Sequence, residues 1–331
     1  MDKEKIKLKI EEEYEIKVKT VEKVKNTYKI NGDEGYCLKV SQYKFPHFYF
    51  ILSSINHLLN KGFDGVLDII ETKNKVKYIE VEGKYAYLTK WIKARQSNFE
   101  NLDELGKVSS KLSELHVYST DFTITPMMNP RIYWFSWIKT FKTRINEIKD
   151  FENRISQKAH KNEFDKLFLS NVDKEVERGF KSVYGLENSK YISVMEDQMM
   201  RRSFCHHDFA NHNILIDEEE NIKIIDFDYC ILDSNLHDLA SLIIRSMKSN
   251  GWNTNIANIV LDGYSKNITV CEDELNIMKE FIRFPQEFWQ IGLQVYWEQQ
   301  PWGEEFFIKK LNKYLNSIED RTRFIDNFFK F

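Results

Sequence analysis

The sequence has no long apolar run. No stretch of its 331 residues approaches the roughly 18 consecutive apolar residues that a membrane-spanning helix requires. The opening segment, MDKEKIKLKIEEEYEIKVK, contains no continuous apolar core of the kind that marks a secretory signal. We therefore expect synthesis in the cytoplasm without a signal peptide, and no membrane partner.

Cysteine is scarce and the charge is nearly balanced. The four cysteines, Cys37, Cys205, Cys230 and Cys271, form no CxxC pair. A chain of this length can build a core without disulfides, so we expect free thiols in a reducing compartment. The net charge of −3 provides no basic excess for nucleic acid or an anionic membrane surface. The sequence therefore predicts no nucleic-acid partner.

The composition is otherwise that of a folded chain with a sizeable core. Hydrophobic residues make up 42% and charged residues 30%, which is ordinary for globular proteins. The length predicts about two domains or one large two-lobed domain. The residue pattern changes near position 92, so we expect a β-rich lobe over 1–92 and a helical lobe over 93–331.

The first lobe shows the alternation of antiparallel strands. Alternating apolar residues occur between positions 14 and 40, interrupted by the turn NGDEG, which is a strong hairpin signal. Lys39 lies on the last of these strands and shares a face with Cys37, opposite Leu38 and Val40. The charged segment 1–15 is expected to form a short helix or a frayed arm. A main helix and further strands complete a lobe of about five strands. We place that helix at 46–59 and the strands at 66–71, 75–80 and 83–92.

The second lobe is predicted to be mainly helical, because its apolar residues recur at helical spacing. Several amphipathic helices rich in aromatic residues are expected after position 256. The earlier helices are expected at 102–117, 134–155, 164–184 and 237–247.

One stretch of the second lobe, FCHHDFANHNILIDEEENIKIIDFD at 204–228, has a different pattern. Two β-branched runs flank an acidic tip, which is typical of a β-hairpin. A hairpin returns its two ends to the same place. Asp208, Asn213 and Asp226 should therefore meet at one end of it, with Asp228 close by.

Those side chains suit phosphoryl transfer. The Asp208 carboxylate can accept the proton of an attacking hydroxyl group. The Asn213 amide oxygen and the Asp226 carboxylate are hard oxygen ligands, which can hold Mg²⁺ on nucleotide phosphates. The plain alternative is a buried polar hairpin that matches this pattern by chance.

Two other kinds of site are conceivable in the same stretch. His206, His207, Asp208 and His212 could form a metal-hydrolase cluster, but such ligands come from helices, and this stretch continues into a strand. Cys205 could act as a thiol nucleophile beside His206. Neighbouring strand residues point to opposite faces, however, and a single apolar-strand cysteine is usually buried and inert.

The order H-x-D, four residues, Asn, hairpin, D-F-D is similar to that of aminoglycoside phosphotransferases and choline kinases. More narrowly, the sequence resembles the CotS-type spore coat proteins of endospore-forming bacteria. This resemblance implies a two-lobed, protein-kinase-like α+β fold, ATP and Mg²⁺ as cofactors, and a place in the spore coat. The phrases that carry it are NTYKI, YCLKV, YLTKWI, LGKVSSKLSELH, CHHDFANHNILI, IIDFD, HDLASLI and FPQEFWQIGLQVYWE.

The resemblance also implies a role for each matching residue. Asp208 would be the catalytic base, and Asn213, Asp226 and Asp228 would bind metal. Lys39 would orient the α- and β-phosphates. His206 would be a scaffold residue of the catalytic loop, which Asp238 would brace, although by position Asp238 also fits an N-cap. Backbone groups of four residues would bind adenine: Leu88, Thr89, Lys90 and Trp91.

Three features depart from the family pattern. His207 stands where these phosphotransferases usually have glycine. The segment KVKNT at 23–27, where a phosphate-covering loop belongs, has no glycine. No Asp or Glu occurs from Ser41 to Phe63, although the kinase lysine normally pairs with a helix carboxylate. The missing carboxylate partner of Lys39 could be replaced by one of five residues: Gln42, His47, Asn56, Glu71 or Glu80.

The sequence therefore favours an ATP- and Mg²⁺-dependent phosphotransferase that acts on a hydroxyl group of a small molecule or of a coat protein, with other coat proteins as partners. The alternative is a structural coat component that has kept the kinase-like fold without catalysis. Candidate acceptor contacts in the C-terminal part are Arg245, Glu287, Gln290, Tyr296 and Glu298.

Overall fold

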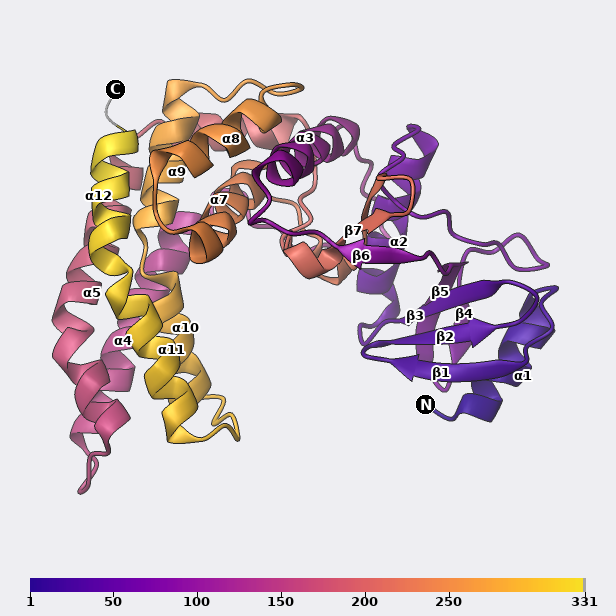
Figure 1. Ribbon diagram of the computed structural model, residues 1–331, viewed down its shortest axis with the longest axis horizontal. Helices are drawn as coiled ribbons and strands as arrows, with labels where there is room; N and C mark the ends of the chain where they lie inside the picture. Colours follow the sequence, from indigo (N-terminus) through magenta and orange to yellow (C-terminus); the bar gives the residue numbers. More distant parts are fainter. Residues whose placement is uncertain (330–331) are drawn as a thin grey trace. The chain divides into compact units, whose positions relative to one another are not determined.

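The computed structural model describes residues 1–329, apart from the side chain of Ser249. The chain forms two compact units (Figure 1), the first made of residues 1–132 and 201–238 and the second of 133–200 and 239 onward. The hairpin thus belongs to the same unit as the β-rich segment. The functional boundary expected between residues 92 and 93 stays a prediction, and the last two residues of the lobe 93–331 lie outside the described residues.

The first unit contains a five-stranded antiparallel sheet in the order β1-β2-β3-β5-β4. The number of strands agrees with the prediction, and the NGDEG turn joins β2 to β3. Helix α1 (Lys3–Glu13) precedes the sheet, and α2 (Phe45–Asn60) follows β3. The strands are β1 (Thr20–Val24), β2 (Thr27–Asn31), β3 (Gly35–Val40), β4 (Ile79–Val81) and β5 (Lys84–Lys90).

The two faces of this sheet carry different residues. Leu38, Val40 and Leu88 point to one face, where they are buried in a core with Ile6 and Ile10 of α1. The opposite face carries Lys39 and Cys37, as their alternation with Leu38 and Val40 predicts. Their β5 partners on that face are Tyr87 and Thr89.

One predicted strand is wrong. The segment expected as a strand at 66–71 makes only an isolated bridge between Ile69 and Thr89. Strand β4 already occupies the same edge of β5, pairing with Lys84 through Ala86. Only the far end of that edge remains for the earlier segment, so it cannot pair along its length.

The hairpin lies in a second, smaller sheet of the same unit. Strands β7 (Ile214–Asp217) and β8 (Ile222–Ile224) pair as predicted. A third strand, β6 (Ala94–Gln96), pairs with β7 and was not predicted. All its residues are exposed, so no apolar alternation signals it. This unit also contains α3 (Leu102–Tyr118) and the short 3-10 turns η1 (Asn211–Asn213) and η2 (Phe227–Tyr229).

The second unit is helical, and its aromatic residues form a core that includes Phe151, Phe168 and Phe288. Helix α6 was not predicted, although its buried Tyr191, Val194 and Met195 have helical spacing. The helices are α4 (Trp137–Ser156), α5 (Glu163–Glu187), α6 (Tyr191–Met200), most of α7 (Leu236–Asn250), α8 (Thr254–Tyr264), α9 (Glu272–Arg283), α10 (Gln286–Tyr296), α11 (Glu304–Asn316) and α12 (Ile318–Phe328).

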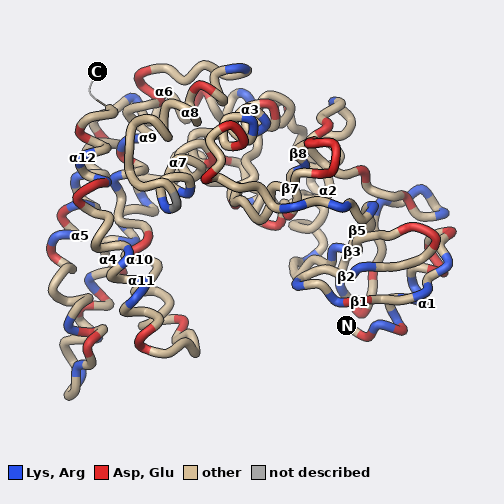
Figure 2. Tube along the Cα trace, viewed as in Figure 1, with Lys and Arg blue, Asp and Glu red and all other residues tan. Residues whose placement is uncertain are grey.

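Acidic and basic residues are interspersed along the described parts of both units (Figure 2). None of the described helices combines the length and the apolar character needed to cross a lipid bilayer.

Candidate functional site

The ends of the β7–β8 hairpin bring the predicted polar residues together. The Asn213 side-chain amide donates to the carbonyl oxygen and to Oδ2 of Asp208, both at 3.0 Å. The backbone N–H of Ile225 donates to the Asn213 carbonyl at 2.9 Å, which places Asp226 directly beside Asn213. The structure therefore assembles Asp208, Asn213 and Asp226 at one end of the hairpin.

Lys39 joins this group through both carboxylates of the D-F-D element. Its Nζ donates to Asp226 Oδ1 at 2.7 Å and lies 3.0 Å from Asp228 Oδ2. The Lys39 side chain is only 9% exposed. Burial by itself would lower the pKa of Lys39, but the two carboxylates outweigh it and raise that pKa. The ammonium is therefore a fixed positive charge between the two acids.

Asp228 is affected in the opposite way. Burial raises the pKa of the Asp228 carboxyl group, and the attraction of Lys39 opposes this rise. The Lys39 ammonium therefore favours the ionised form of Asp228 against the effect of burial.

None of the expected substitutes reaches Lys39. Gln42 accepts a hydrogen bond from Lys84, and Asn56 accepts one from Lys77. The His47 ring contacts the Asn129 carbonyl oxygen through Nδ1 at 3.1 Å. Glu71 lies near Lys75, and Glu80 is exposed. The acids after β8 thus replace the missing carboxylate of α2.

Asp238 supports the loop before the hairpin. Its two carboxylate oxygens accept hydrogen bonds from the backbone N–H groups of His206 (2.7 Å) and His207 (2.8 Å). Burial would raise the pKa of Asp238, but hydrogen bonds with His116 and His237 hold it well below its usual value. The N-cap interpretation of Asp238 is wrong, because α7 begins at Leu236 and the carboxylate binds another segment.

His207 adopts a backbone conformation that favours glycine. Its φ is +67°, in the left-handed region, and Asp226 has a φ of +65°. These two strained residues direct polar groups to the open end of the hairpin, and their backbone conformations cost conformational free energy. The His207 ring stacks on that of His237, with centroids 4.0 Å apart, and this contact offsets part of the cost of a side chain here.

A pocket of about 640 Å³ opens beside these residues within the first unit. This volume lies within the range of small-molecule sites. The sheet face with Lys39 and Cys37 lines one side of it, and the hairpin lines another through Asn213 and Asp226. The glycine-free loop between β1 and β2 also contributes to its wall.

Three of the four residues expected to bind adenine line this pocket, namely Thr89, Lys90 and Trp91. Leu88 instead is fully buried, and its carbonyl oxygen accepts a hydrogen bond from the Ile70 N–H at 2.8 Å. The Trp91 N–H donates a hydrogen bond to the Gly35 carbonyl oxygen of β3. Because successive residues of a strand direct their backbone groups to alternate sides, the N–H and C=O groups of Lys90 point away from β3.

The donor set fits Mg²⁺. Asp226 and Asp228 already hold a cation between them in the form of the Lys39 ammonium. The amide nitrogen of Asn213 is used by Asp208, which leaves its oxygen as the available ligand. Carboxylate and amide oxygens are the ligands that Mg²⁺ prefers.

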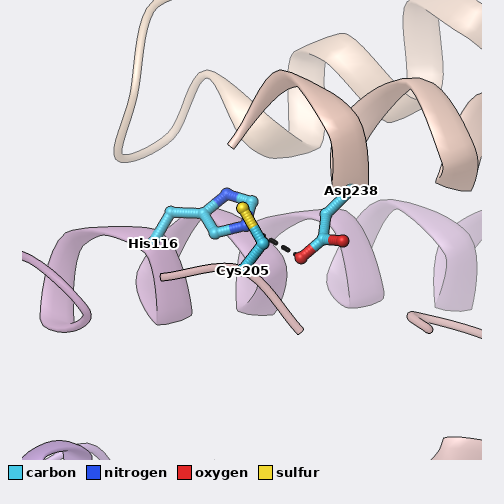
Figure 3. Close-up of side chains that lie close together, drawn as sticks. All are labelled: His116, Cys205 and Asp238. Atoms are coloured by element: carbon cyan, nitrogen blue, oxygen red, sulfur yellow. Dashed lines mark hydrogen bonds and ion pairs between the residues drawn. The ribbon is translucent and has the colours of Figure 1, made fainter. Parts of the chain in front are cut away.

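The two rival site types do not fit. Among the residues that the structure describes, the group able to surround a metal ion is His116, Cys205 and Asp238 (Figure 3), not the alternative cluster of His206, His207, Asp208 and His212. The Asp238 oxygens there are used by backbone N–H groups. The Cys205 thiol is buried and donates to the Asp233 and Ser234 carbonyl oxygens. Burial raises the pKa of Cys205 well above its usual value, so it is no nucleophile.

One acceptor candidate is excluded by its surroundings in the second unit. The Tyr296 hydroxyl is buried and donates to Asp165 Oδ1 at 2.9 Å. Glu287 forms an ion pair with Lys248 at 2.9 Å. Tyr296 is therefore part of the helical core.

The chain is similar to known proteins over most of its length. A family model described as "Spore coat putative kinase YutH" matches residues 7–328. Spore coat protein S of Bacillus subtilis (strain 168) is 23% identical over 303 residues, which cover 90% of this chain and 85% of that protein.

Solved structures show the same fold at low identity. An aminoglycoside phosphotransferase from Alicyclobacillus acidocaldarius superposes with a TM-score of 0.83 and 19% identity, covering 96% of this chain and 93% of that one. Spectinomycin phosphotransferase, solved with ADP and spectinomycin, gives a TM-score of 0.67 and 16% identity over 98% of both chains. The predicted two-lobed kinase-like α+β fold is thereby confirmed.

Proposed function

Because the chain belongs to the YutH family of kinase-like spore coat proteins, we propose that it is a phosphotransferase of the bacterial spore coat. It transfers the γ-phosphoryl group of ATP to a hydroxyl acceptor, on a small molecule or on a coat protein. The observation that carries this proposal is the convergence of Lys39, Asn213 and Asp226 on one pocket of about 640 Å³.

The lining of the pocket suits both parts of a nucleotide. Trp91 and Ile92 provide apolar surface beside the outward-pointing backbone of Lys90, where adenine would bind. Lys39, Asn213 and Asp226 provide a cation and metal ligands, where phosphates would lie. Solved phosphotransferases of this fold contain ADP or AMP, which supports a nucleotide as the partner.

The reaction assigns each residue one task. The acceptor hydroxyl oxygen forms a bond to the γ-phosphorus while the bond to the β-phosphate oxygen breaks and ADP leaves. Asp208 accepts the hydroxyl proton through a carboxylate that Asn213 orients at 3.0 Å. Mg²⁺, held by Asn213, Asp226 and Asp228, would neutralise charge on the transferred group. Lys39 then exchanges its carboxylate partners for nucleotide phosphates.

A matched pair of variants tests this function. Wild-type protein should show Mg²⁺-dependent stabilisation by ATP in a thermal shift assay, together with measurable ATP turnover. Asp208→Asn should keep the stabilisation and lose the turnover, because the amide cannot accept the proton. Absence of any shift with millimolar Mg²⁺-nucleotide would contradict the proposal.

A second candidate is a structural coat component without turnover. The glycine-free loop over 23–27 and the use of Lys39 by the metal-binding acids favour it, because both make phosphate binding harder. Asp208→Ala separates the two candidates. If ATP hydrolysis and spore assembly are both unchanged in this variant, the structural role is the correct one.

A further inference from the structure

A half-buried arginine lies next to the D-F-D element without an acidic partner. The guanidinium of Arg131 sits 5.2 Å from the ring centre of Tyr43 and 5.9 Å from that of Tyr229, the residue after Asp228. Its Nη2 donates to the Tyr43 hydroxyl at 3.0 Å. These contacts fix the plane of the guanidinium between two aromatic rings.

The backbone around Arg131 is fixed as well. The Leu232 N–H donates to the Arg131 carbonyl at 3.0 Å, and Ile132 bridges Leu232. On the other side, the Asn129 N–H donates to the Pro46 carbonyl at 3.0 Å. Arg131 is therefore held where the start of α2 meets the segment that follows Asp228.

Several other cations of this unit are paired with carboxylates. Arg95 lies 2.9 Å from Glu104, and Lys111 lies 2.5 Å from Glu114. Among the residues that the structure describes, no carboxylate lies within ion-pair distance of Arg131. Only one of its five N–H donors is used by Tyr43, so a forked pair remains available to an external group.

One further polar atom of this cluster lacks a close hydrogen bond. The Tyr43 ring contacts His47 edge-on at 4.5 Å, and His47 is 9% exposed. Its Nε2 is buried and makes no close hydrogen bond within residues 1–329, although the Asp228 backbone lies near enough to raise the pKa of the ring against the effect of burial. A buried polar atom without a partner costs free energy unless a ligand or water satisfies it.

We propose that Arg131, with Tyr43 and Tyr229, binds an oxyanion group, a carboxylate or a phosphate, on the hydroxyl acceptor. A planar guanidinium with parallel N–H donors matches both groups in bidentate geometry. The acceptor would therefore be anionic. The acceptor role rests on the phosphotransferase function proposed above, whereas the binding of an oxyanion does not.

Binding is tested first, without turnover. Inorganic phosphate and acetate are titrated by calorimetry into the protein, both alone and in the presence of Mg²⁺ with a non-hydrolysable ATP analogue, whose three phosphates would keep the probes out of the nucleotide pocket. Arg131→Gln should weaken binding of the better probe by about tenfold or more, because charged hydrogen bonds are lost. The control Arg201→Gln, an exposed arginine of the same unit, should bind as wild type does.

Two milder variants keep the test valid if Arg131→Gln does not fold. Arg131→Lys retains the charge without the fork, and Tyr43→Phe retains the ring without the hydroxyl group that orients the guanidinium. Both should weaken anion binding while circular dichroism and the melting temperature stay near wild type. Unchanged affinity in these variants would overturn the oxyanion site.

The acceptor role is tested with three alcohols that differ in charge. Phosphoryl transfer from ATP is compared for glycerol, glycerate and glycerol 3-phosphate. Glycerate or glycerol 3-phosphate should be preferred over glycerol by about tenfold or more, and Arg131→Gln should remove that preference. The preferred member identifies carboxylate or phosphate as the recognised group.

The outcomes separate this inference from the general function. ATP turnover without any oxyanion binding at Arg131 overturns the inference and leaves the phosphotransferase in place. Oxyanion binding that Arg131→Gln removes, in a protein that never hydrolyses ATP, supports the site and contradicts the phosphotransferase function.

Discussion

Lys39 and Asp226 form a hydrogen bond of 2.7 Å although 187 positions separate them in the sequence. In the kinase pattern, the lysine pairs with a carboxylate of the helix that follows its strand. Here that helix has no acid, and the lysine neutralises residues that would bind the metal. The same two acids therefore have two possible cations, the Lys39 ammonium and Mg²⁺. This competition gives the first prediction.

Replacing Lys39 by methionine should destabilise the protein and make its stability depend on Mg²⁺. Without the ammonium, Asp226 and the half-buried Asp228 repel one another, which should lower the free energy of unfolding by roughly 1–3 kcal/mol. Mg²⁺ should restore more stability to Lys39→Met than it adds to wild type. Urea unfolding with and without Mg²⁺ measures both effects.

The control for this variant is Lys5→Met. Lys5 forms an ion pair of 3.0 Å with Glu82, but its side chain is 62% exposed. Exposed pairs contribute little, so this change should alter the free energy of unfolding much less than Lys39→Met does. An equal loss of stability in Lys5→Met and Lys39→Met would mean that the ion pairs of Lys39 stabilise the fold no more than an exposed pair does.

Asp238→Asn should loosen the loop that carries Asp208. An asparagine can accept only one of the hydrogen bonds from His206 and His207, and its NH₂ group would face the other N–H. We expect a loss of about 2 kcal/mol in stability and a fall in ATP turnover with little change in the nucleotide KM. Unchanged kcat in a folded variant would show that this support does not position the base.

Asp238 should also contribute to the pH dependence of folding. Its pKa is held well below the usual value in the folded state, so its contribution is complete above about pH 4, near the unfolded pKa. The contribution is lost as the pH falls toward the folded pKa. Urea midpoints between pH 2 and 6 should therefore fall more steeply for wild type than for Asp238→Asn. If the urea midpoints of wild type and Asp238→Asn changed equally with pH, the lowered pKa of Asp238 would be contradicted.

His207→Gly and His207→Val test the left-handed turn. Glycine removes the strain at φ +67° but also removes the contact with His237, so its stability should stay within about 1 kcal/mol of wild type. Valine is β-branched and should destabilise by about 1–3 kcal/mol. Thermal unfolding of both variants measures the difference. Equal stability of the two would indicate that the turn adapts without strain.

Local patterns predicted the parts of the site that lie close together in sequence. The β-branched runs around the acidic tip placed the hairpin, and a hairpin necessarily brings Asn213 and Asp226 together. The alternation around Lys39 likewise predicted its face of the sheet. These inferences needed only the period of a strand and the closure of a turn.

Contacts between distant segments were not predictable in this way. Nothing local to Lys39 indicates that it pairs with Asp226 and Asp228. The local position of Asp238 indicated an N-cap, and its support of the loop before the hairpin was expected only from the family resemblance. Arg131 belongs to no sequence motif, and its contacts with Tyr43 and Tyr229 are apparent only from the structure. Strand β6 was missed for a related reason, because exposed residues carry no periodic signal.

The most direct test of the central claim is a comparison of nucleotide binding by wild type and Asp226→Asn. Calorimetry with ATP should show tight binding to wild type only in the presence of Mg²⁺, and this metal dependence should disappear in Asp226→Asn. ATP binding that is equally strong with and without Mg²⁺ in wild type, or no binding at millimolar nucleotide, would contradict the account.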